Sequence, residues 1–183
     1  MKLKQISLFA MAAIVLAGQP LHAQKPVKVG GALMYASKNI VENALNSKDH
    51  TTLVAAVKAA GLVPTLESKG PFTVFAPTNE AFDQLPKGTV SNLLKPENKQ
   101  MLTQVLTYHV VPGKIDKEEL MKKINKGNGK AVLKTVEGEN LTFMMSKGHI
   151  WIIDQKGNKA MITIPNVYQS NGVIHVINKV LMP

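Results

Sequence analysis

Histidine is the residue type in this sequence with the widest chemical range, because it can bind metals, move protons or hydrogen-bond within a core. Four histidines follow the N-terminal segment: His50, His109, His149 and His175. None lies within four residues of another, so the close spacing of zinc ligands on one helix or strand is missing. A lone histidine in an apolar run is more often a hydrogen-bonded core residue than a ligand. We therefore expect no metal site.

The other residue types of common catalytic sites form no recognisable arrangement. The 183 residues include no cysteine, which excludes thiol nucleophiles and thiolate metal ligands. No Gly-x-Ser-x-Gly motif occurs, and the run Gly127–Gly129 is typical of a turn rather than of a phosphate-binding loop. The sequence therefore predicts a protein that is not an enzyme and has no cofactor.

Lysine provides the strongest candidate binding feature. The segment 114–134 holds seven lysines against three carboxylates, an excess of four positive charges. The lysines are Lys114, Lys117, Lys122, Lys123, Lys126, Lys130 and Lys134. Such a segment favours electrostatic contact with an acidic polysaccharide, although an ordinary solvated surface has the same composition.

The overall charge also indicates an anionic partner, but not nucleic acid. The formal net charge is +10, and all 22 basic residues are lysine. Arginine makes the bidentate contacts to phosphate and guanine on which nucleic-acid readers depend, and it does not occur here. We therefore expect acidic glycan or another anionic surface as the partner, or else a charge that only keeps the protein in solution.

The pattern along the chain predicts helices first and strands later. Apolar spacing indicates helices within residues 33–45, 51–60, 78–83, 96–108 and 118–124. Short β-branched or aromatic runs indicate strands at 72–76, 131–136, 141–145, 149–153, 160–164 and 173–177. Short turn-like links separate the later strands, which is typical of antiparallel hairpins. The predicted fold class is therefore α+β.

The first 23 residues have the pattern of an export signal. Two lysines precede an apolar run from Ile6 to Ala17, and Ala23 stands where a signal peptidase would cut. The run is shorter than the roughly 20 apolar residues that a membrane span needs. We expect residues 1–23 to be a signal peptide, 24–36 a linker and 37–183 one domain. The mature protein would then be periplasmic, extracellular or at the cell surface, with no membrane span.

Three segments resemble the fasciclin domain family. They are Thr73–Phe82 (TVFAPTNEAF), Leu106–Gly113 (LTYHVVPG) and Ser170–Ile177 (SNGVIHVI), in the order and spacing of that family. The run Leu53–Leu62 (LVAAVKAAGL) precedes them and completes a likeness that covers residues 37–183. The resemblance implies a wedge-shaped β-sandwich flanked by several helices.

The family motifs are mainly structural, so the resemblance implies a fold more firmly than a ligand. We expect Thr78 or Asn79 to cap a helix and the side chains of Tyr108 and His109 to tie loop backbone to the core. The motif residues expected to be architectural are Thr78, Asn79, Tyr108, His109, Asn171, Gly172 and His175. Asn171 and Gly172 are expected to form a tight turn before a central strand.

Two positions depart from the family pattern. Family members often carry an acidic residue where Asn166 stands and another where Asn178 stands. The first of these acids belongs to a segment proposed to contact integrins in animal relatives. Because Asn166 carries no charge, the resemblance does not extend to integrin binding here.

The resemblance favours a secreted, non-catalytic adhesion module that contacts glycans or proteins of a cell surface or matrix. The alternative is a carrier of an apolar small molecule, a lipid or a pigment, because nine methionines can line an adaptable surface. The sequence specifies neither the identity of the partner nor the oligomeric state.

Overall fold

The computed structural model describes residues 24–183, so the expected signal peptide, residues 1–23, lies outside the described part. The strands are β1 (Val27–Val29), β2 (Ala32–Met34), β3 (Phe72–Pro77), β4 (Val110–Pro112), β5 (Lys130–Lys134), β6 (Asn140–Ser146), β7 (His149–Ile153), β8 (Lys159–Gln169) and β9 (Gly172–Ile177). The helices are α1 (Ile40–Ala44), α2 (Thr51–Ala60), α3 (Val63–Glu67), α4 (Asn79–Asp83), α5 (Thr89–Leu93), α6 (Lys99–Tyr108) and α7 (Lys117–Lys126), with 3-10 turns η1 (Lys48–His50) and η2 (Pro96–Asn98).

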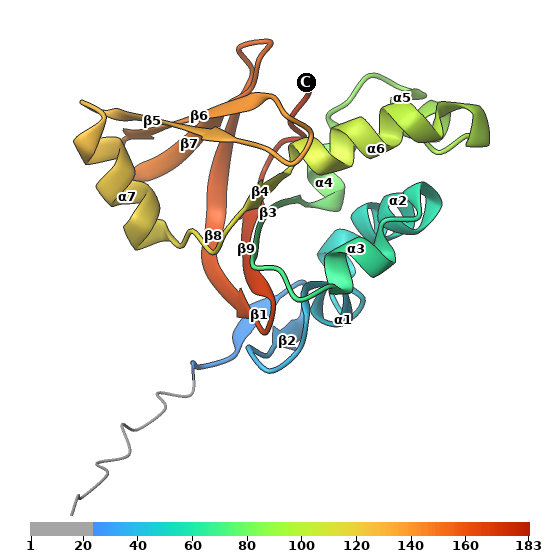
Figure 1. Cartoon of the computed structure of the whole chain (residues 1–183). Coiled ribbons are helices and arrows are strands. Elements are labelled where there is room, and N and C mark those ends of the chain that lie inside the picture. The colour runs from blue at the N-terminus through green and yellow to red at the C-terminus, as the bar shows by residue number, and fades with distance from the viewer. Residues whose placement is uncertain (1–23) are drawn as a thin grey trace, which may run out of the picture.

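Seven strands form one mixed sheet in the order β4-β3-β9-β8-β7-β6-β5. β3 and β9 pair in parallel, whereas the other neighbours in this sheet are antiparallel. β8 pairs with β7 through its first residues, Lys159–Met161, and with β9 through the longer remainder, Ile162–Gln169. It therefore carries the sheet from one layer into the next, and Figure 1 shows β5–β7 folded over the layer of β3 and β9. The Val136 N–H donates to the Val110 carbonyl at 2.7 Å and links the two ends of the bent sheet.

The space inside the bent sheet is filled by aromatic and aliphatic side chains. Phe75 of β3 and Phe143 of β6 are fully buried, with ring centroids 5.2 Å apart. One face of α7 places Leu120 and Ile124 in the same core. This inner core holds the two layers together because its members come from strands of both layers and from α7.

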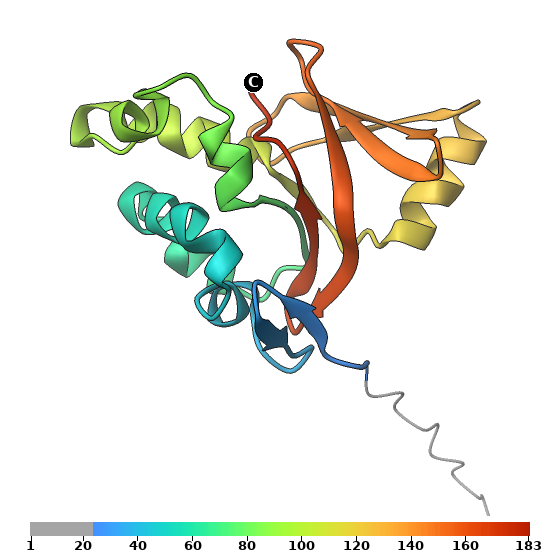
Figure 2. The same ribbon diagram turned by 180° about the vertical axis from the view of Figure 1, so that it is seen from behind.

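A second core lies on the other face of β3 and β9. Helices α1–α6 cover this face, as the two opposite views in Figures 1 and 2 show. Val74 and Ile174 project from the sheet into this core, where they meet side chains of α2 such as Leu53 and Val57. Alternate residues of β3 therefore serve opposite cores, as the pleat of a strand requires.

The α+β class predicted from the sequence is confirmed, with two differences in the strands. β8 runs to Gln169, past Pro165, whereas the sequence predicted a strand ending at residue 164. Register shifts between Ile162 and Val167 let the strand bend there, so the proline does not end it. The short strand β4 was not predicted, because three residues are too few to show a pattern.

The interpretation of residues 24–36 as a linker is wrong. Strands β1 and β2 form an antiparallel hairpin in this segment, and Val29 and Met34 are buried in the helix-side core. Gly30 has a φ of +56°, and a Cβ there would lie 2.3 Å from the Ser47 hydroxyl. The paired glycines, which indicated a linker in the sequence, thus form a tight turn packed against the domain.

Candidate functional site

His109 connects the end of α6 to the C-terminal segment. The side chain is 3% exposed, and its Nδ1 donates to the Val105 carbonyl at 2.7 Å while its Nε2 accepts from the Leu181 N–H at 2.9 Å. Accepting at Nε2 fixes the proton on Nδ1, so the ring is neutral and both nitrogens are used. Burial lowers the pKa of His109 to about 4, and the Val105 carbonyl opposes part of this shift. The ring thus has no nitrogen left for a metal or for proton transfer.

Tyr108 connects α6 to the inner core. Its ring is fully buried, and its hydroxyl donates to the Asn140 carbonyl at 3.1 Å and accepts from the Gln155 N–H at 3.0 Å. Burial raises the pKa of Tyr108 to about 12. The hydroxyl therefore stays protonated and joins the start of β6 to the loop that follows β7.

His175 lies on the opposite face of the sheet from His109. It stacks on Phe75 at 5.6 Å between ring centroids, its Nε2 donates to the Ile115 carbonyl at 2.9 Å, and its Nδ1 accepts from the Asn166 N–H. Burial lowers the pKa of His175, and the Ile115 carbonyl opposes that effect. Within residues 24–183, no three His, Cys, Asp or Glu side chains gather in a way that would hold a metal ion.

Asn171 fastens the turn between β8 and β9 to the helices, and Gly172, the first residue of β9, lies close to β3. The Asn171 side chain accepts from the Ile40 N–H and donates to the carbonyls of Leu66 and Ser68, so one amide joins the start of α1 to the end of α3. A Cβ on Gly172 would lie 2.0 Å from the Phe72 carbonyl. Glycine is thus needed at position 172 for close strand approach, and not for a left-handed backbone.

Thr78 and Asn79 cap two different helices. The Thr78 hydroxyl accepts from the Ala81 N–H and caps α4. The Asn79 amide oxygen accepts instead from the Thr52 N–H at 3.0 Å, at the start of α2, where the helix has no cap from its own N-cap side chain. Asn79 also donates to the Lys48 carbonyl, so it joins α4 to the turn before α2.

Asn166 lies at the N-terminus of α7. Its amide oxygen accepts from the Lys117 N–H at 2.7 Å, and its amide nitrogen donates to the Glu118 carboxylate at 2.7 Å. Its backbone has a φ of +60°, which asparagine tolerates better than most residues. An acidic residue here would lose the donor and face the Glu118 carboxylate, so the neutral amide suits this helix start.

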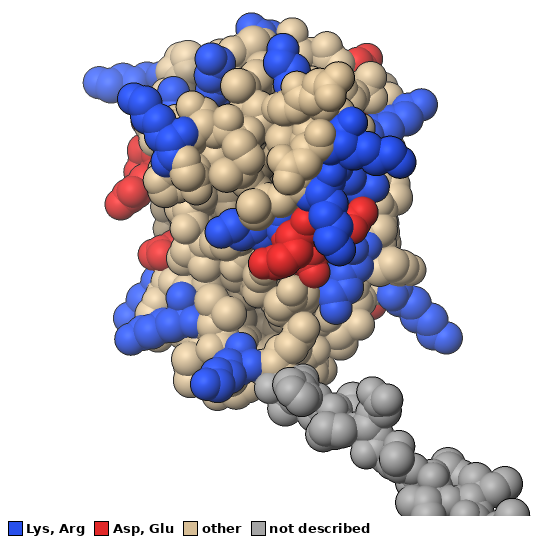
Figure 3. Space-filling model, turned by 90° about the vertical axis from the view of Figure 1, so that its left-hand side faces the viewer, with Lys and Arg blue, Asp and Glu red and all other residues tan. Residues whose placement is uncertain are grey.

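The lysines of α7 are part of the helix's own electrostatics. Lys123 pairs with Glu119 at 3.3 Å, and both Lys123 and Lys126 lie in the last turn, where the helix dipole favours positive charge. Asp116 caps the first turn, in which Glu118 and Glu119 also lie. Figure 3 shows carboxylates among the lysines on the side of the molecule that carries α7.

The other lysines of the segment lie outside α7, either before the helix or on β5. Lys114 precedes the helix and its Nζ lies 4.8 Å from the centre of the Tyr168 ring, a cation–π contact. Lys130 and Lys134 are exposed residues of β5. The seven lysines of the sequence prediction are therefore spread over the loop before α7 (Lys114), α7 itself (Lys117, Lys122, Lys123 and Lys126) and β5 (Lys130 and Lys134), which packs against α7.

Lys130 and Lys134 belong to the outward side of the sheet. Phe143 and Ile152 point into the inner core, so the residues beside them in β6 and β7 point outward. In the strand register Lys130 lies opposite Met144, Met144 opposite Trp151 and Trp151 opposite Met161. We call this surface the outer face; its residues are Lys130, Val132, Lys134, Asn140, Thr142, Met144, Trp151, Ile153, Lys159 and Met161.

The outer face combines apolar area with positive charge. Val132 is 60% exposed, and Met144, Trp151 and Met161 are half-buried. None of the outer-face positions carries a carboxylate. The Trp151 indole N–H donates to the Ser146 carbonyl at 3.3 Å, which restricts the ring.

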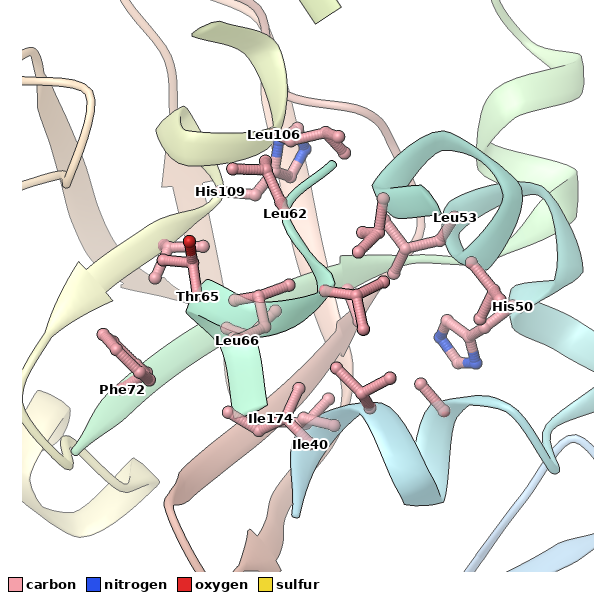
Figure 4. Close-up of a pocket in the computed structure, with 18 of the residues that line it drawn as sticks. Ile40, His50, Leu53, Leu62, Thr65, Leu66, Phe72, Leu106, His109 and Ile174 are labelled. Atoms are coloured by element: carbon pink, nitrogen blue, oxygen red, sulfur yellow. The ribbon is translucent and has the colours of Figure 1, made fainter. Parts of the chain in front are cut away.

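A separate apolar cavity of about 70 Å³ lies on the helix side of β3. It is enclosed mainly by α1, α2, α3, β3 and the C-terminal end of α6, and its walls are almost entirely apolar (Figure 4). Thr65 and Val136 are exposed members of its lining, whereas Met34, Ala76 and His50 are buried members. The cavity thus runs from the surface into the helix-side core.

His50 is the polar group at the buried end of the cavity. Its side chain is 1% exposed, and its Nδ1 lies 2.9 Å from the Ser47 hydroxyl. Across residues 24–183, its Nε2 is the buried side-chain nitrogen or oxygen atom with no hydrogen-bond partner. Burial lowers the pKa of His50; the nearby Ala76 carbonyl opposes this shift but is not in hydrogen-bonding geometry with Nε2.

Sequence reasoning did not single out Trp151 or the cavity, and it treated His50 as one of four isolated histidines. Strand alternation in β6 and β7 places Trp151 on the side opposite Ile152, so its outward position was open to prediction. The cavity depends on how elements from distant parts of the chain pack together, and no local pattern signals it.

Comparisons with known proteins establish the family. The model of the fasciclin domain matches residues 48–183, and the chain belongs to the fasciclin family. Protein sll1483 of Synechocystis sp. is 47% identical over 160 residues, which are 87% of this chain and 82% of that protein. The cell surface glycolipoprotein MPB83 of Mycobacterium bovis is 30% identical over 88% of this chain and 68% of its own length.

One further relative and one solved structure are larger than this chain. Transforming growth factor-beta-induced protein ig-h3 of Sus scrofa is 39% identical over 132 residues, 72% of this chain but 17% of that protein. The solved FAS1 domain pair of the insect cell adhesion molecule fasciclin I matches with a TM-score of 0.70 and 18% identity, over 80% of this chain and 51% of that one. This likeness supports the fold. Among the described helices, none has the length and hydropathy that a bilayer crossing requires.

Proposed function

We propose that this protein is an exported, non-catalytic binding module that holds acidic polysaccharide of a cell surface or matrix against its outer face. The observation that carries the proposal is the composition of that face, where Trp151 lies among methionines and lysines with no carboxylate beside them. A sugar ring has an apolar side that packs well on an indole. Lysines around the indole attract the carboxylate or sulfate groups of an acidic glycan.

The family relationship supports an adhesive role outside the cytoplasm. One relative is named as a cell surface glycolipoprotein, and the solved domain pair comes from a cell adhesion molecule. The signal-like pattern of residues 1–23 agrees with export to the periplasm, the cell surface or the medium. The buried histidines, with their ring nitrogens mostly engaged by backbone, offer little to a catalytic mechanism.

The proposal is tested by binding of residues 24–183 to alginate, a polymer of uronic acids, with neutral dextran as the control polymer. We expect saturable binding to alginate that weakens as salt rises, because exposed charges are screened. No binding at low salt, or equal binding to dextran, would contradict the proposal. If the domain bound a cell-surface protein and not the glycan, its partner would be a protein.

Two triple variants separate the outer face from α7 at equal loss of charge. Replacing Lys130, Lys134 and Lys159 with Gln should weaken alginate binding about tenfold, since each exposed pair contributes a few tenths of a kcal/mol or more. Replacing Lys122, Lys123 and Lys126 with Gln removes the same charge from α7 and should have a much smaller effect. Equal losses in both variants would mean that the attraction is diffuse and that the outer face is not the contact surface.

A carrier of an apolar small molecule remains the second candidate function. The observation that favours it is the cavity, whose walls are apolar and whose lining includes exposed residues such as Thr65 and Val136. Native mass spectrometry of protein purified from its source organism tests this function. A protein free of any bound small molecule would count against a carrier.

A further inference from the structure

We propose that the cavity binds a small apolar molecule that carries one hydroxyl group, and that this hydroxyl hydrogen-bonds to Nε2 of His50. The inference rests on the second candidate function and is independent of glycan binding on the outer face. It names both the ligand chemistry and the residue that recognises it.

His50 Nε2 is the observation that gives the cavity a polar requirement. The atom is buried, lacks a hydrogen-bond partner and belongs to a side chain that lines the cavity. Figure 4 shows the imidazole at one end of the cavity, facing the aliphatic side chains that include Leu53 and Ile40. A buried polar atom without a partner is costly, so a ligand that supplies one gains more than the contact alone.

The Ser47 contact explains why the ligand group should be a hydroxyl. Ser47 either donates to Nδ1, which leaves Nε2 protonated, or accepts from Nδ1, which leaves Nε2 as an acceptor. A hydroxyl both donates and accepts, so it matches either tautomer, whereas a carbonyl only accepts and an ammonium group only donates.

An ionised ligand group does not suit the buried end of the cavity. Burial lowers the pKa of His50, so the ring is neutral at pH 7 and provides no countercharge. The nearest cationic side chain that lines the cavity is Lys58, which is exposed on α2. A carboxylate placed against His50 would lose its hydration without an ion-pair partner, and that cost excludes fatty acids bound with the carboxylate inward.

The size of the cavity limits what can be buried. About 70 Å³ corresponds to roughly five water-sized spheres, enough for a small ring or a short chain. The open rim at Thr65 and Val136 lets the rest of a longer molecule extend toward solvent. An alkylphenol or a medium-chain alcohol, inserted with the hydroxyl first, therefore fits both the shape and the polarity.

The experiment compares 4-propylphenol with propylbenzene, two molecules that differ by one hydroxyl. Titration calorimetry on residues 24–183 should show that the phenol binds about tenfold more tightly, as expected for a hydrogen bond to a buried polar atom. In nitrogen-detected NMR of the histidine side chains, the phenol should shift the Nε2 resonance of His50, and the hydrocarbon should shift it much less. Equal affinity for the two molecules, or no binding of either, would overturn the proposal.

Three variants locate the site. In His50→Asn the amide nitrogen takes the place of Nδ1 and leaves nothing at Nε2, so the preference for the phenol should disappear. In His50→Gln the amide reaches the position of Nε2, so the preference should persist. Val54→Phe narrows the cavity from α2 and should abolish binding of both molecules, while a cooperative thermal transition shows that the variant is folded. Unchanged binding in the folded Val54→Phe variant would place the ligand elsewhere and refute the inference.

The outcomes separate this inference from the carrier function. Selective phenol binding in vitro by a protein that carries nothing when purified from its source would support the site and reject the carrier. Loss of alginate binding in the outer-face variants leaves the cavity unaffected, because the two surfaces use different elements.

Discussion

The buried, neutral state of His109 predicts that acid will destabilise this protein before its carboxylates titrate fully. The pKa of His109 is about 4 in the folded protein, against 6.5 for an ordinary histidine. Between these two values the unfolded chain binds a proton that the folded protein does not. The free energy of unfolding therefore falls as the pH decreases from 6.5 to 4, and the contribution of this residue is fully present above pH 6.5.

The magnitude follows from the same two pKa values. At about 1.4 kcal/mol per pH unit, a difference of 2.5 gives a loss of about 3 kcal/mol between pH 7 and pH 4. Burial of His50 and His175 lowers their pKa values too, so they add to the loss in the same direction. For His109, protonation of Nε2 breaks a hydrogen bond, because the protonated nitrogen no longer accepts from the Leu181 N–H.

Urea denaturation at a series of pH values measures this effect. The variant His109→Gln keeps an acceptor near the position of Nε2 but cannot be protonated, so it should be less stable than the original protein at pH 7 and have a shallower pH dependence. An exposed histidine provides the control, and His149→Gln should retain the original pH dependence. Parallel curves for the original protein and His109→Gln from pH 7 to pH 4.5 would refute the reasoning, since both contain the same carboxylates.

Two further changes test the remaining anchors. Tyr108→Phe removes the hydroxyl between the Asn140 carbonyl and the Gln155 N–H and should lower the free energy of unfolding by about 1–3 kcal/mol, measured by urea denaturation; a change within error would mean that water replaces the hydroxyl. Asn79→Ala removes the acceptor at the start of α2, so it should lower the free energy of unfolding by about 1 kcal/mol and speed amide exchange in α2. Glu80→Ala changes the next residue of α4 without removing that acceptor, so amide exchange in α2 should stay unchanged.

The order of helices and strands was predictable because it depends on local patterns. The apolar residues of α2 and α6 recur at helical spacing, and the hairpins from β5 to β8 pair strands that are neighbours in the chain. The family motifs added the fold itself, and the match of the fasciclin model to residues 48–183 confirms that recognition. The start of the folded domain was less predictable, because the hairpin β1–β2 lies in a segment that the sequence indicated to be a linker.

The candidate sites were less accessible to sequence reasoning. The lysine segment stood out by composition, yet it divides between α7, where carboxylates and the helix dipole account for part of its charge, and β5. His50 stands at the start of α2, and the absence of a partner for its Nε2 becomes visible only when the surrounding elements are in place. Charge can be read from composition, but the partner of a charge or of a polar atom depends on tertiary packing.

The sequence by itself determined which chemical groups the protein has: it contains no thiol and no arginine, and its histidines are isolated from one another. The local spacing of its motifs also determined the helices, the turns and the family. The tertiary structure alone decided the parallel pairing of β3 with β9, which joins segments about a hundred residues apart. It also decided the outer face and the cavity, because both are made by side chains from elements that share no local pattern. Local backbone preferences act over a few residues, whereas burial and polar satisfaction act between whatever segments the fold brings together.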